Sequence, residues 1–490
     1  MRLILGGPGT GKTTRLLNIM QECIEAGVSP SRIAFVSFTK KAAREARERA
    51  IDRFGLTHDD LPYFKTLHSL AYSQSGSSRN EVMGDANYKE FAEHAGVTLS
   101  RYRDNNIAAV GTDGDKALHV MSFAHATCMP LYDAWHHTGE GIEWHTLQYI
   151  AESYKHYKQD AHKIDFGDML DRSIMHGGPL DVDTVIIDEA QDLSTRLWDV
   201  ANSMFMTAQQ TIVAGDDMQS IFRWAGANID RFLSLTERPE VLPISYRLPR
   251  EVFDLADSIS DRVVHKYDKQ WAPSDHDGAV HRASYSEPFD FSEGSWMILA
   301  RNACFLTEFK QRVREVGYAY ATNGATSVDA EEVQAILEYE HLRKGGSVDT
   351  ERLTHVSEYM GHNRLNNLPH DDERMYTAKD VHDDHGFDIN GTPWFDALLT
   401  IGDEQRQYYQ AIMRNGAKLT DEPRIYIGTI HSVKGGEADN VVLSTDITYR
   451  TRCGYDLSPD DEHRVFYTGV TRAKRNLYVL DPSTTEFYPV

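Results

Sequence analysis

The sequence predicts an α/β protein with two mainly parallel sheets, flanking helices and mainly helical insertions. Short apolar runs bounded by turn or cap residues recur along the chain, and stretches with helical patterning separate them. This alternation is typical of parallel sheets, whose strands are joined by crossover helices. A first group of predicted strands covers residues 2–5, 32–38, 184–188 and 211–216, and a second group covers residues 295–301, 424–430, 440–446 and 476–481.

Two segments lack clear strand patterns and are predicted to be helical insertions. Residues 72–164 are rich in aromatic residues and histidine, and residues 325–420 are polar and charged. A chain of 490 residues exceeds the usual size of one hydrophobic core, so several domains are expected. The predicted division is 1–71 with 165–240, then 72–164, then 241–324 with 421–490, and finally 325–420.

The composition indicates an intracellular globular protein without a membrane partner or a disulfide framework. No uninterrupted apolar window reaches about 18 residues, the length of a membrane-spanning helix, and the N-terminus enters a predicted strand instead of a signal peptide. The four cysteines form no CxxC pair. The formal net charge of -23 disfavours nucleic acid, but residues 40–53 carry six basic and three acidic residues. A basic track on an acidic body is still compatible with DNA.

A phosphate-binding loop follows the first predicted strand. Residues 6–13, GGPGTGKT, match the pattern G-x-x-x-x-G-K-[ST] between a strand and a helix. The glycines let backbone amides turn toward phosphates, Lys12 can reach the outer phosphates, and the Thr13 hydroxyl can bind Mg²⁺. The expected nucleotide-binding residues are Gly6, Gly7, Pro8, Gly9, Thr10, Gly11, Lys12, Thr13 and Thr14.

Two adjacent carboxylates end the predicted strand 184–188. We expect Asp188 to hold Mg²⁺ with Thr13, and Glu189 to orient or deprotonate the attacking water. Phosphoryl transfer also needs positive charge near the γ-phosphate. Arg247 and Arg472 are the candidates, although either could instead be an ordinary surface arginine.

Eight segments, in order, resemble the UvrD/Rep/PcrA-like superfamily 1A helicases. They are GGPGTGKT (6–13), FVSFTKKAAREARERA (35–50), TLHSLAY (66–72), VIIDEAQDLS (185–194), VAGDDMQSIFRWAGA (213–227), ISYRLP (244–249), GTIHSVKGGEADNVVL (428–443) and YTGVTRAKRNLYVL (467–480). The resemblance implies two RecA-like P-loop NTPase motor domains, 1A (1–71 and 165–240) and 2A (241–324 and 421–490), with inserted subdomains 1B (72–164) and 2B (325–420). It implies an ATP-dependent DNA helicase that moves 3′ to 5′ along single-stranded DNA, with ATP and Mg²⁺ as cofactors.

The resemblance also implies roles for single residues around the nucleotide. Gln219 would sense the γ-phosphate, and Arg247 and Arg472 would act as arginine fingers. Tyr246 would stack on the base, and Glu437 would contact the ribose. In this family a glutamine-containing segment before the loop reads adenine, but only five residues precede Gly6 here. We therefore expect relaxed selectivity among nucleoside triphosphates, because stacking discriminates bases weakly.

A second set of residues is expected to contact DNA. The set is Phe38, Thr39, Thr66, His68, Phe222, Trp224 and His431. Trp224 stands where the family has a base-stacking tryptophan, and an aromatic platform holds single strands with little sequence preference. Phe38 and Phe222 could extend this platform, and each of the three aromatic residues could instead belong to the core. The threonines and histidines are expected to contact the DNA backbone.

Three functions are compatible with these motifs. The first is a DNA helicase, the second is an ATPase that strips proteins from single strands without processive unwinding, and the third is a nucleotide-gated DNA-binding subunit. The complete set of catalytic residues disfavours the third. The expected partners are single-stranded DNA, junctions with duplex DNA, and single-strand-binding, replication or repair proteins. The expected location is the cytoplasm of a bacterium or of a phage-infected cell.

Overall fold

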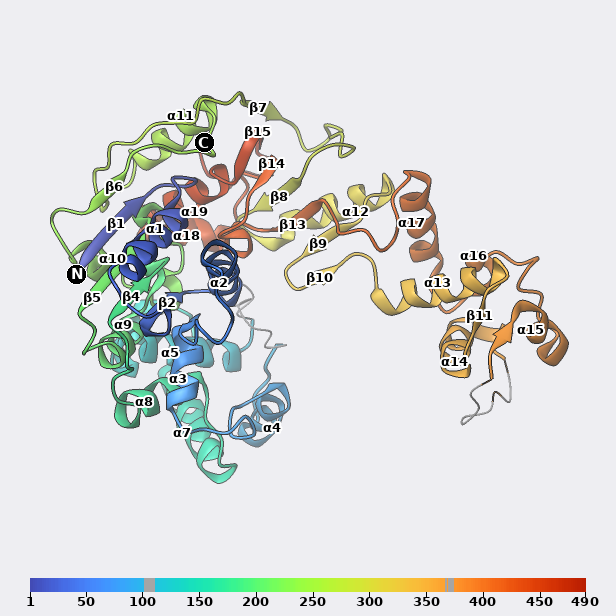
Figure 1. Cartoon of the computed structure of the whole chain (residues 1–490), viewed down its shortest axis with the longest axis horizontal. Helices are drawn as coiled ribbons and strands as arrows, with labels where there is room; N and C mark the ends of the chain where they lie inside the picture. Colours follow the sequence, from blue (N-terminus) through green and yellow to red (C-terminus); the bar gives the residue numbers. More distant parts are fainter. Residues whose placement is uncertain (101–110, 366–367, 369–373) are drawn as a thin grey trace. The chain divides into compact units, whose positions relative to one another are not determined.

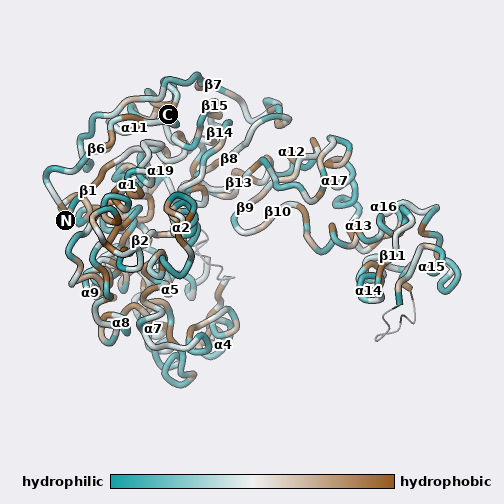
Figure 2. The backbone as a smooth tube through the Cα atoms, in the orientation of Figure 1, coloured by the Kyte–Doolittle hydropathy of each residue, from teal (hydrophilic) through white to brown (hydrophobic). Residues whose placement is uncertain are grey.

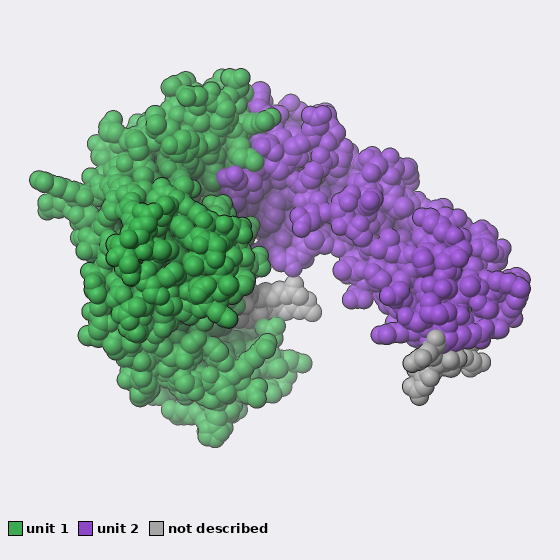
Figure 3. All heavy atoms as spheres, in the orientation of Figure 1, with its two compact units in different colours: residues 1–280, 448–475, 490 green, residues 281–447, 476–489 purple. Residues whose placement is uncertain are grey.

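The chain divides into two compact units, which Figure 3 distinguishes by colour. The computed structural model describes residues 1–100, 111–365, 368 and 374–490. Unit 1 comprises residues 1–280, 448–475 and 490, and unit 2 comprises residues 281–447 and 476–489. The four-part division expected from the sequence stays a prediction.

Unit 1 contains a parallel sheet that begins with the first residues of the chain (Figure 1). Its strands are β1 (Arg2–Gly6), β2 (Ile33–Ser37), β3 (Phe64–Thr66), β4 (Thr184–Ile187), β5 (Gln210–Gly215) and β6 (Glu240–Leu242). The strand order is β3-β2-β4-β5-β1-β6, and adjacent strands are parallel. The four strands predicted for this group are confirmed. The strands β3 and β6 were not predicted, because three residues are too few to show an apolar period.

Helices cover both faces of this sheet. Successive side chains of a strand point to opposite faces, so Ile4 packs against one set of helices while Leu3 and Leu5 pack against the other. The Ile4 face is covered by α1 (Lys12–Glu25) and α2 (Lys40–Phe54). The opposite face is covered by α3 (Leu67–Gln74), α8 (Phe166–His176), α9 (Thr195–Met204) and α10 (Ile229–Leu233). Burial on both faces explains why the strands read as continuous apolar runs.

The helix α2 is amphipathic, as its sequence indicates. Ala43, Ala46 and Ala50 are its buried residues, and Thr39 caps its N-terminus. Figure 2 shows much of α2 in teal, the hydrophilic end of the scale. The basic residues of this segment therefore lie on the surface of unit 1.

The segment that follows α3 is helical, as predicted. It contains α4 (Asp85–Ala95), α5 (Asp113–Thr127), α6 (Leu131–Thr138) and α7 (Trp144–Asp160). These helices share a hydrophobic cluster that includes Phe91, Val120, Leu147 and Ile150. Unit 1 is completed by α11 (Arg250–Ser260), α18 (Tyr449–Leu457) and α19 (Pro459–Val470).

A second sheet lies mainly in unit 2. Its strands are β7 (Ala279–Ala283), β8 (Trp296–Ala300), β9 (Tyr320–Thr322), β10 (Ala325–Thr326), β13 (Ile425–Thr429), β14 (Ala438–Leu443) and β15 (Ala473–Leu480). The order is β10-β9-β13-β8-β14-β15-β7. The central pairs β9–β13, β13–β8 and β8–β14 are parallel, and β9–β10 is antiparallel. The four strands predicted for the second group are confirmed.

Helices complete unit 2. The helix α12 (Thr307–Glu315) packs Phe309 and Val313 into the same cluster as Trp296 and Ile298 of β8. The remaining helices are α13 (Ala330–Arg343), α14 (Thr350–Tyr359), α15 (Ala378–His385), α16 (Trp394–Ala397) and α17 (Asp403–Arg414), with a small antiparallel pair of strands, β11 (Ser347–Val348) and β12 (Tyr376–Thr377). They surround a core of their own. Among the described residues, no helix combines the length and the apolar character needed to cross a bilayer.

The sheet of unit 1 determines where its polar motifs meet. Parallel strands have their carboxyl ends at one edge of the sheet. There β1 leads into the phosphate-binding loop, β4 leads to Asp188, and β5 leads to Asp216. The fold therefore gathers the three motifs although they are far apart in sequence.

Candidate active site

The phosphate-binding loop turns sharply between β1 and α1. Gly9 and Gly11 have left-handed backbones, with φ of 72° and 79°, which residues with a Cβ rarely adopt. A Cβ on Gly9 would lie 2.2 Å from the Cβ of Arg247, and one on Gly7 would lie 2.5 Å from the indole of Trp271. The loop therefore needs glycine at these positions. It ends at the N-terminus of α1, where backbone amides favour an anion.

The polar side chains of the loop fit a nucleotide with a divalent cation. The Lys12 Nζ donates to the carbonyl of Gly6 at 2.9 Å, which keeps the ammonium folded over the loop. The Thr13 hydroxyl is close enough to Asp188 to lower the pKa of its carboxyl, so a hydroxyl and a carboxylate lie together. An ammonium over glycine-rich backbone and this oxygen pair form the donor set for a nucleoside triphosphate with Mg²⁺. Thr14, in the first turn of α1, is exposed.

Asp188 is buried directly after β4. Its backbone N–H donates to the Val36 carbonyl at 2.8 Å, and its carboxylate accepts a hydrogen bond from the Glu189 N–H at 2.9 Å. Burial, and after it the charge of Glu189, raise the pKa of Asp188 to about 7, while Lys12 and Thr13 act in the opposite direction. A bound dication would favour the ionised carboxylate.

Glu189 has an unusual backbone and a defined hydrogen-bond partner. Its φ of 55° and ψ of 38° place it in the left-handed region, which is costly for a non-glycine residue and is found at functional sites. Its carboxylate accepts from the Gln191 amide Nε2 at 2.6 Å. The other end of the buried Gln191 side chain, Oε1, accepts from the Asp216 N–H at 3.1 Å. Gln191 therefore connects the end of β4 to the end of β5.

Asp216 extends this connection to the Gln219 and Arg472 pair. The carboxylate of Asp216 accepts from the Gln219 Nε2 at 2.7 Å, and the Gln219 Oε1 accepts from the Arg472 Nη2 at 2.9 Å. The Arg472 Nε donates to the Thr468 carbonyl at 2.9 Å. Burial, followed by repulsion from Arg247, lowers the pKa of Arg472 to about 9. Negative charge arriving here would stabilise the guanidinium.

The segment with Tyr246 and Arg247 lies against the phosphate-binding loop. The Ser245 hydroxyl donates to the Pro8 carbonyl at 2.8 Å, and the Tyr246 N–H donates to the Gly9 carbonyl at 2.8 Å. The Tyr246 side chain is nevertheless open to solvent, with 73% of the residue exposed. An exposed ring fixed beside the loop through its backbone is suited to stacking on a base. The Thr10 hydroxyl donates within the loop, to the Gly7 carbonyl at 2.9 Å.

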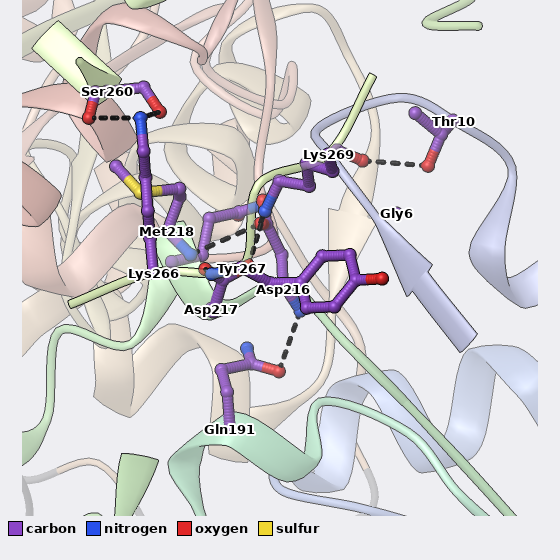
Figure 4. Close-up of polar contacts among 12 residues, drawn as sticks. Gly6, Thr10, Gln191, Asp216, Asp217, Met218, Ser260, Lys266, Tyr267 and Lys269 are labelled. Atoms are coloured by element: carbon purple, nitrogen blue, oxygen red, sulfur yellow. Dashed lines mark hydrogen bonds and ion pairs between the residues drawn. The ribbon is translucent and has the colours of Figure 1, made fainter. Parts of the chain in front are cut away.

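A buried lysine that the sequence did not single out enters the same network. Figure 4 shows the Lys269 amine directed at the carboxylates of Asp216 and Asp217. Its Nζ is 2.6 Å from Asp216 Oδ1, and it also contacts Asp217. Lys269 lies 53 positions from Asp216 in an irregular segment, so no local pattern predicts the contact.

The aromatic residues expected to bind DNA form a row. The rings of Phe38 and Phe222 stack with centroids 5.5 Å apart, and Phe222 meets Trp224 edge-on at 6.3 Å. His119 of α5 continues the row, 6.2 Å from Trp224. Phe38 also packs against the core of unit 1, so the two alternatives for this residue are not exclusive. Trp224 lies in the short helix η5 (Arg223–Ala225).

His119 also ties the backbone of Trp224 to the helical insertion. Its Nε2 is 3.2 Å from the Trp224 carbonyl, and its Nδ1 is 2.7 Å from the Glu140 carboxylate. Arg450 donates to the same carboxylate at 2.5 Å. The two ring nitrogens of His119 therefore link the Trp224 backbone to Glu140. His119 was missed in the sequence because it belongs to none of the eight motifs.

Three other expected DNA contacts have structural partners in unit 1. The hydroxyls of Thr39 and Thr66 accept hydrogen bonds from Ala42 N–H at 3.1 Å and Ser69 N–H at 3.2 Å, and so cap α2 and α3. His68 packs edge-on against Phe166, with centroids 6.3 Å apart. Burial lowers the pKa of His68 to about 4, so the ring is neutral near pH 7.

The last two expected site residues belong to unit 2. His431 lies in η8 (Ile430–Val433), and Glu437 comes directly before β14. The contacts expected of His431 with DNA and of Glu437 with the ribose stay predictions.

Family models match both ends of the chain. Residues 1–240 match the UvrD/REP helicase N-terminal domain, and residues 424–480 match the UvrD-like helicase C-terminal domain. The first match includes the phosphate-binding loop, Asp188, Glu189 and Gln219. The second includes Arg472.

Curated relatives extend the similarity. The ATP-dependent DNA helicase PcrA of Bacillus subtilis is 24% identical over 392 residues, which cover 76% of this chain and 52% of that protein. YjcD of the same organism is 23% identical over 594 residues, with 98% of this chain and 77% of that protein covered. The ATP-dependent DNA helicase Rep of Salmonella typhimurium is 24% identical, with 55% and 42% covered. The chain thus spans about half the length of PcrA and less of Rep.

Proposed function

Because the chain belongs to the UvrD/Rep/PcrA-like superfamily 1A helicases, we propose that it is an ATP-dependent DNA helicase that moves 3′ to 5′ along single-stranded DNA. Its motor is the pair of sheets, 1A at residues 1–71 with 165–240 and 2A at residues 241–324 with 421–490. The helical segments 72–164 and 325–420 are the inserted subdomains 1B and 2B. The matches to PcrA and Rep support this assignment.

The phosphate-binding loop and the end of β4 bind the nucleotide in this proposal. Lys12 and the amides at the start of α1 hold the phosphates, and Thr13 with Asp188 holds Mg²⁺, which when bound supplies charge neutralisation at the phosphates. Glu189 accepts the proton of the attacking water. The Gln191 amide, 2.6 Å from the Glu189 carboxylate, fixes its orientation.

Arg247 and Arg472 supply the positive charge beside the γ-phosphate in this proposal. Arg472 is fully buried and lies on Gln219, which we assign as the γ-phosphate sensor. A guanidinium held by protein groups stabilises the charge that develops in phosphoryl transfer, since little reorganisation is needed. Tyr246 stacks on the base, and Glu437 contacts the ribose.

The aromatic row holds single-stranded DNA. Trp224, Phe222 and Phe38 offer rings on which successive bases stack, each base contributing about 1–3 kcal/mol. Thr39, Thr66, His68 and His431 contact the DNA backbone in this proposal. Ser220 and Ile221 are the two residues between Gln219 and Phe222. A movement of Gln219, the γ-phosphate sensor, can therefore be passed along the chain to Phe222 and the aromatic row that holds the DNA.

One observation carries the proposal furthest: a continuous hydrogen-bonded path joins the candidate base to the candidate arginine finger. The path runs from Glu189 through Gln191, Asp216 and Gln219 to Arg472, with donor–acceptor distances of 2.6, 3.1, 2.7 and 2.9 Å. A protein that only bound nucleotide would not need a base and an arginine finger held in one network. The path therefore favours hydrolysis over a binding switch.

Strand displacement tests the proposal. Duplexes with a 3′ tail, a 5′ tail or blunt ends are incubated with the protein, ATP and Mg²⁺, and Lys12→Ala is the control that lacks the phosphate-binding ammonium. We expect strand release from the 3′-tailed duplex alone, and none with Lys12→Ala. Release from 5′ tails would contradict the polarity. Removal of streptavidin from the DNA end without strand release would assign the protein to the stripping ATPases. If the protein shows neither activity, the nucleotide-gated binder is the function that remains.

A further inference from the structure

Lys269 is one of the most deeply buried ammonium groups in the described part of unit 1. Its side chain is 5% exposed, and those of Asp216 and Asp217 are 0% exposed. Lys269 belongs to a segment without helix or strand, residues 264–272, which we call the strap. The strap crosses the end of β5, where the Tyr267 N–H donates to the Asp217 carboxylate at 2.9 Å.

The strap is fixed at both of its ends. The N–H groups of Val264 and His265 donate to the Asp460 carboxylate at 3.0 and 2.9 Å. At the other end the Ala272 N–H donates to the Pro243 carbonyl at 2.8 Å. Next to it, the indole of Trp271 lies on the backbone of Gly7, where a Cβ would come within 2.5 Å. The strap therefore contacts both the phosphate-binding loop and the end of β5.

The charges explain why a lysine is needed here. A buried carboxylate without a partner is costly, and removal of one member of a buried ion pair destabilises a protein strongly. Burial alone would raise the pKa of Asp216, but Lys269, with Lys12 as the next contributor, lowers it below its ordinary value. The pKa of Lys269 is in turn raised by the two carboxylates, although burial opposes this. Asp216 and Lys269 are therefore both charged near neutral pH.

We propose that Lys269 is a positioning residue for the γ-phosphate sensor: its ammonium orients the Asp216 carboxylate, and Asp216 holds Gln219 against Arg472. Lys269 binds Asp216 Oδ1 at 2.6 Å, and Gln219 binds the other oxygen, Oδ2, at 2.7 Å. One carboxylate thus has its two oxygens fixed by different side chains. The inference rests on the proposed function, because it assigns Lys269 to the same hydrolysis site.

A second lysine of the chain provides a matched comparison. Lys158 of α7 contacts two carboxylates as well, Asp165 at 2.7 Å and Asp168 at 2.5 Å, and its side chain is 15% exposed. Those carboxylates cap α8, and neither bonds to a residue of the proposed site among the described contacts. Removal of either ammonium should cost stability, but only Lys269 should affect the site.

The experiment compares the binding of ADP with that of ADP plus aluminium fluoride, which mimics the phosphoryl group in transfer. Wild-type protein should bind the mimic at least about 100-fold more tightly than ADP alone, since groups that act in the transition state favour its analogues. Lys269→Met should lose about tenfold of this preference while ADP affinity changes by about twofold or less, because charge-assisted hydrogen bonds have this magnitude. Lys158→Met should keep the full preference.

A double-mutant cycle shows whether Lys269 acts through Gln219. In a Gln219→Ala background, Lys269→Met should cause no additional loss of the preference, because the residue that Lys269 positions is already absent. An additive loss would contradict the proposed route. If Lys269→Met does not fold, Lys269→Met combined with Asp217→Asn removes one buried negative charge along with the ammonium, and the same loss of preference is expected.

The outcomes separate the inference from the proposed function. Wild-type protein that binds the mimic no better than ADP would contradict the hydrolysis site itself. Wild-type protein that prefers the mimic, together with a folded Lys269→Met variant that prefers it equally, would overturn the role of Lys269 alone. A loss of the same size in Lys158→Met would show that lowered stability is the cause, and would also overturn it.

Discussion

Glu189→Gln separates water activation from every other function of the nucleotide site. Glutamine has the shape of glutamate, and its amide can rotate so that its oxygen still accepts from Gln191 Nε2, which is 2.6 Å from the carboxylate in the native chain. The left-handed backbone at this position, with φ of 55°, costs the same for both residues. The substitution therefore removes the charge and the basicity with little change in geometry.

The expected size of the effect follows from the groups that remain. Loss of a general base lowers turnover by about 10²- to 10⁴-fold, which corresponds to about 3–5 kcal/mol of activation free energy. Lys12, Thr13 and Asp188 are unchanged, so nucleotide affinity should be preserved. Glu189 contributes to the raised pKa of Asp188, so removal of its charge relieves a repulsion and should not lower the free energy of unfolding.

The assay measures phosphate release in the presence of saturating single-stranded DNA, together with the affinities for ATP and DNA. The control is Glu22→Gln on α1, an exposed carboxylate that pairs with Arg15 at 3.0 Å and should leave all three quantities unchanged. Hydrolysis by Glu189→Gln at the wild-type rate would show that Glu189 is not the base. A parallel loss of ATP affinity would show that the substitution disturbs binding.

Other perturbations test the remaining parts of the site. Arg472→Lys retains a positive charge but loses the guanidinium N–H groups that bond to Gln219 and Thr468. Turnover measured by phosphate release should therefore fall about 10³-fold or more. A wild-type rate would exclude an arginine finger at this position. Trp224→Ala should keep DNA-stimulated hydrolysis while stopped-flow translocation slows, because one stacking platform is lost; unchanged translocation would assign Trp224 to the core. The pKa of His68 is about 4 in the folded protein, whereas an ordinary histidine in the unfolded chain has a pKa of about 6.5. The unfolded state therefore binds more protons, and the folded state loses stability as the pH falls from about 6.5 toward about 4. His68→Gln should therefore show a smaller drop in melting temperature between about pH 7 and about pH 5 than the wild type, and an equal drop would contradict the lowered pKa of His68.

Local sequence was sufficient for the parts of the fold that have a local cause. The phosphate-binding loop could be placed because its glycines, lysine and threonine are contiguous and follow an apolar strand. The strands β2, β4 and β5 could be placed because burial on both faces makes each a continuous apolar run. The segment of α2 has the pattern of an amphipathic helix, because its buried residues Ala43, Ala46 and Ala50 are three or four positions apart.

The remainder of the site depends on contacts between distant positions. Lys269 meets Asp217 across 52 positions, and His119 meets Trp224 across 105. Neither residue lies in a motif, and the strap has no periodic pattern. Gln191 is the exception, since it stands two residues after Glu189 in the DEAQ segment. The sequence alone assigned it no role, and only the fold shows that its side chain reaches Asp216.

The central claim is that the nucleotide site of unit 1 hydrolyses ATP in response to single-stranded DNA held by the neighbouring aromatic row. The most direct test is the rate of phosphate release as single-stranded DNA is added, with DNA binding followed in parallel by fluorescence anisotropy. We expect a rate that rises and saturates with DNA occupancy, and that is absent in Lys12→Ala. A rate that stays constant while the DNA becomes fully bound would contradict the claim.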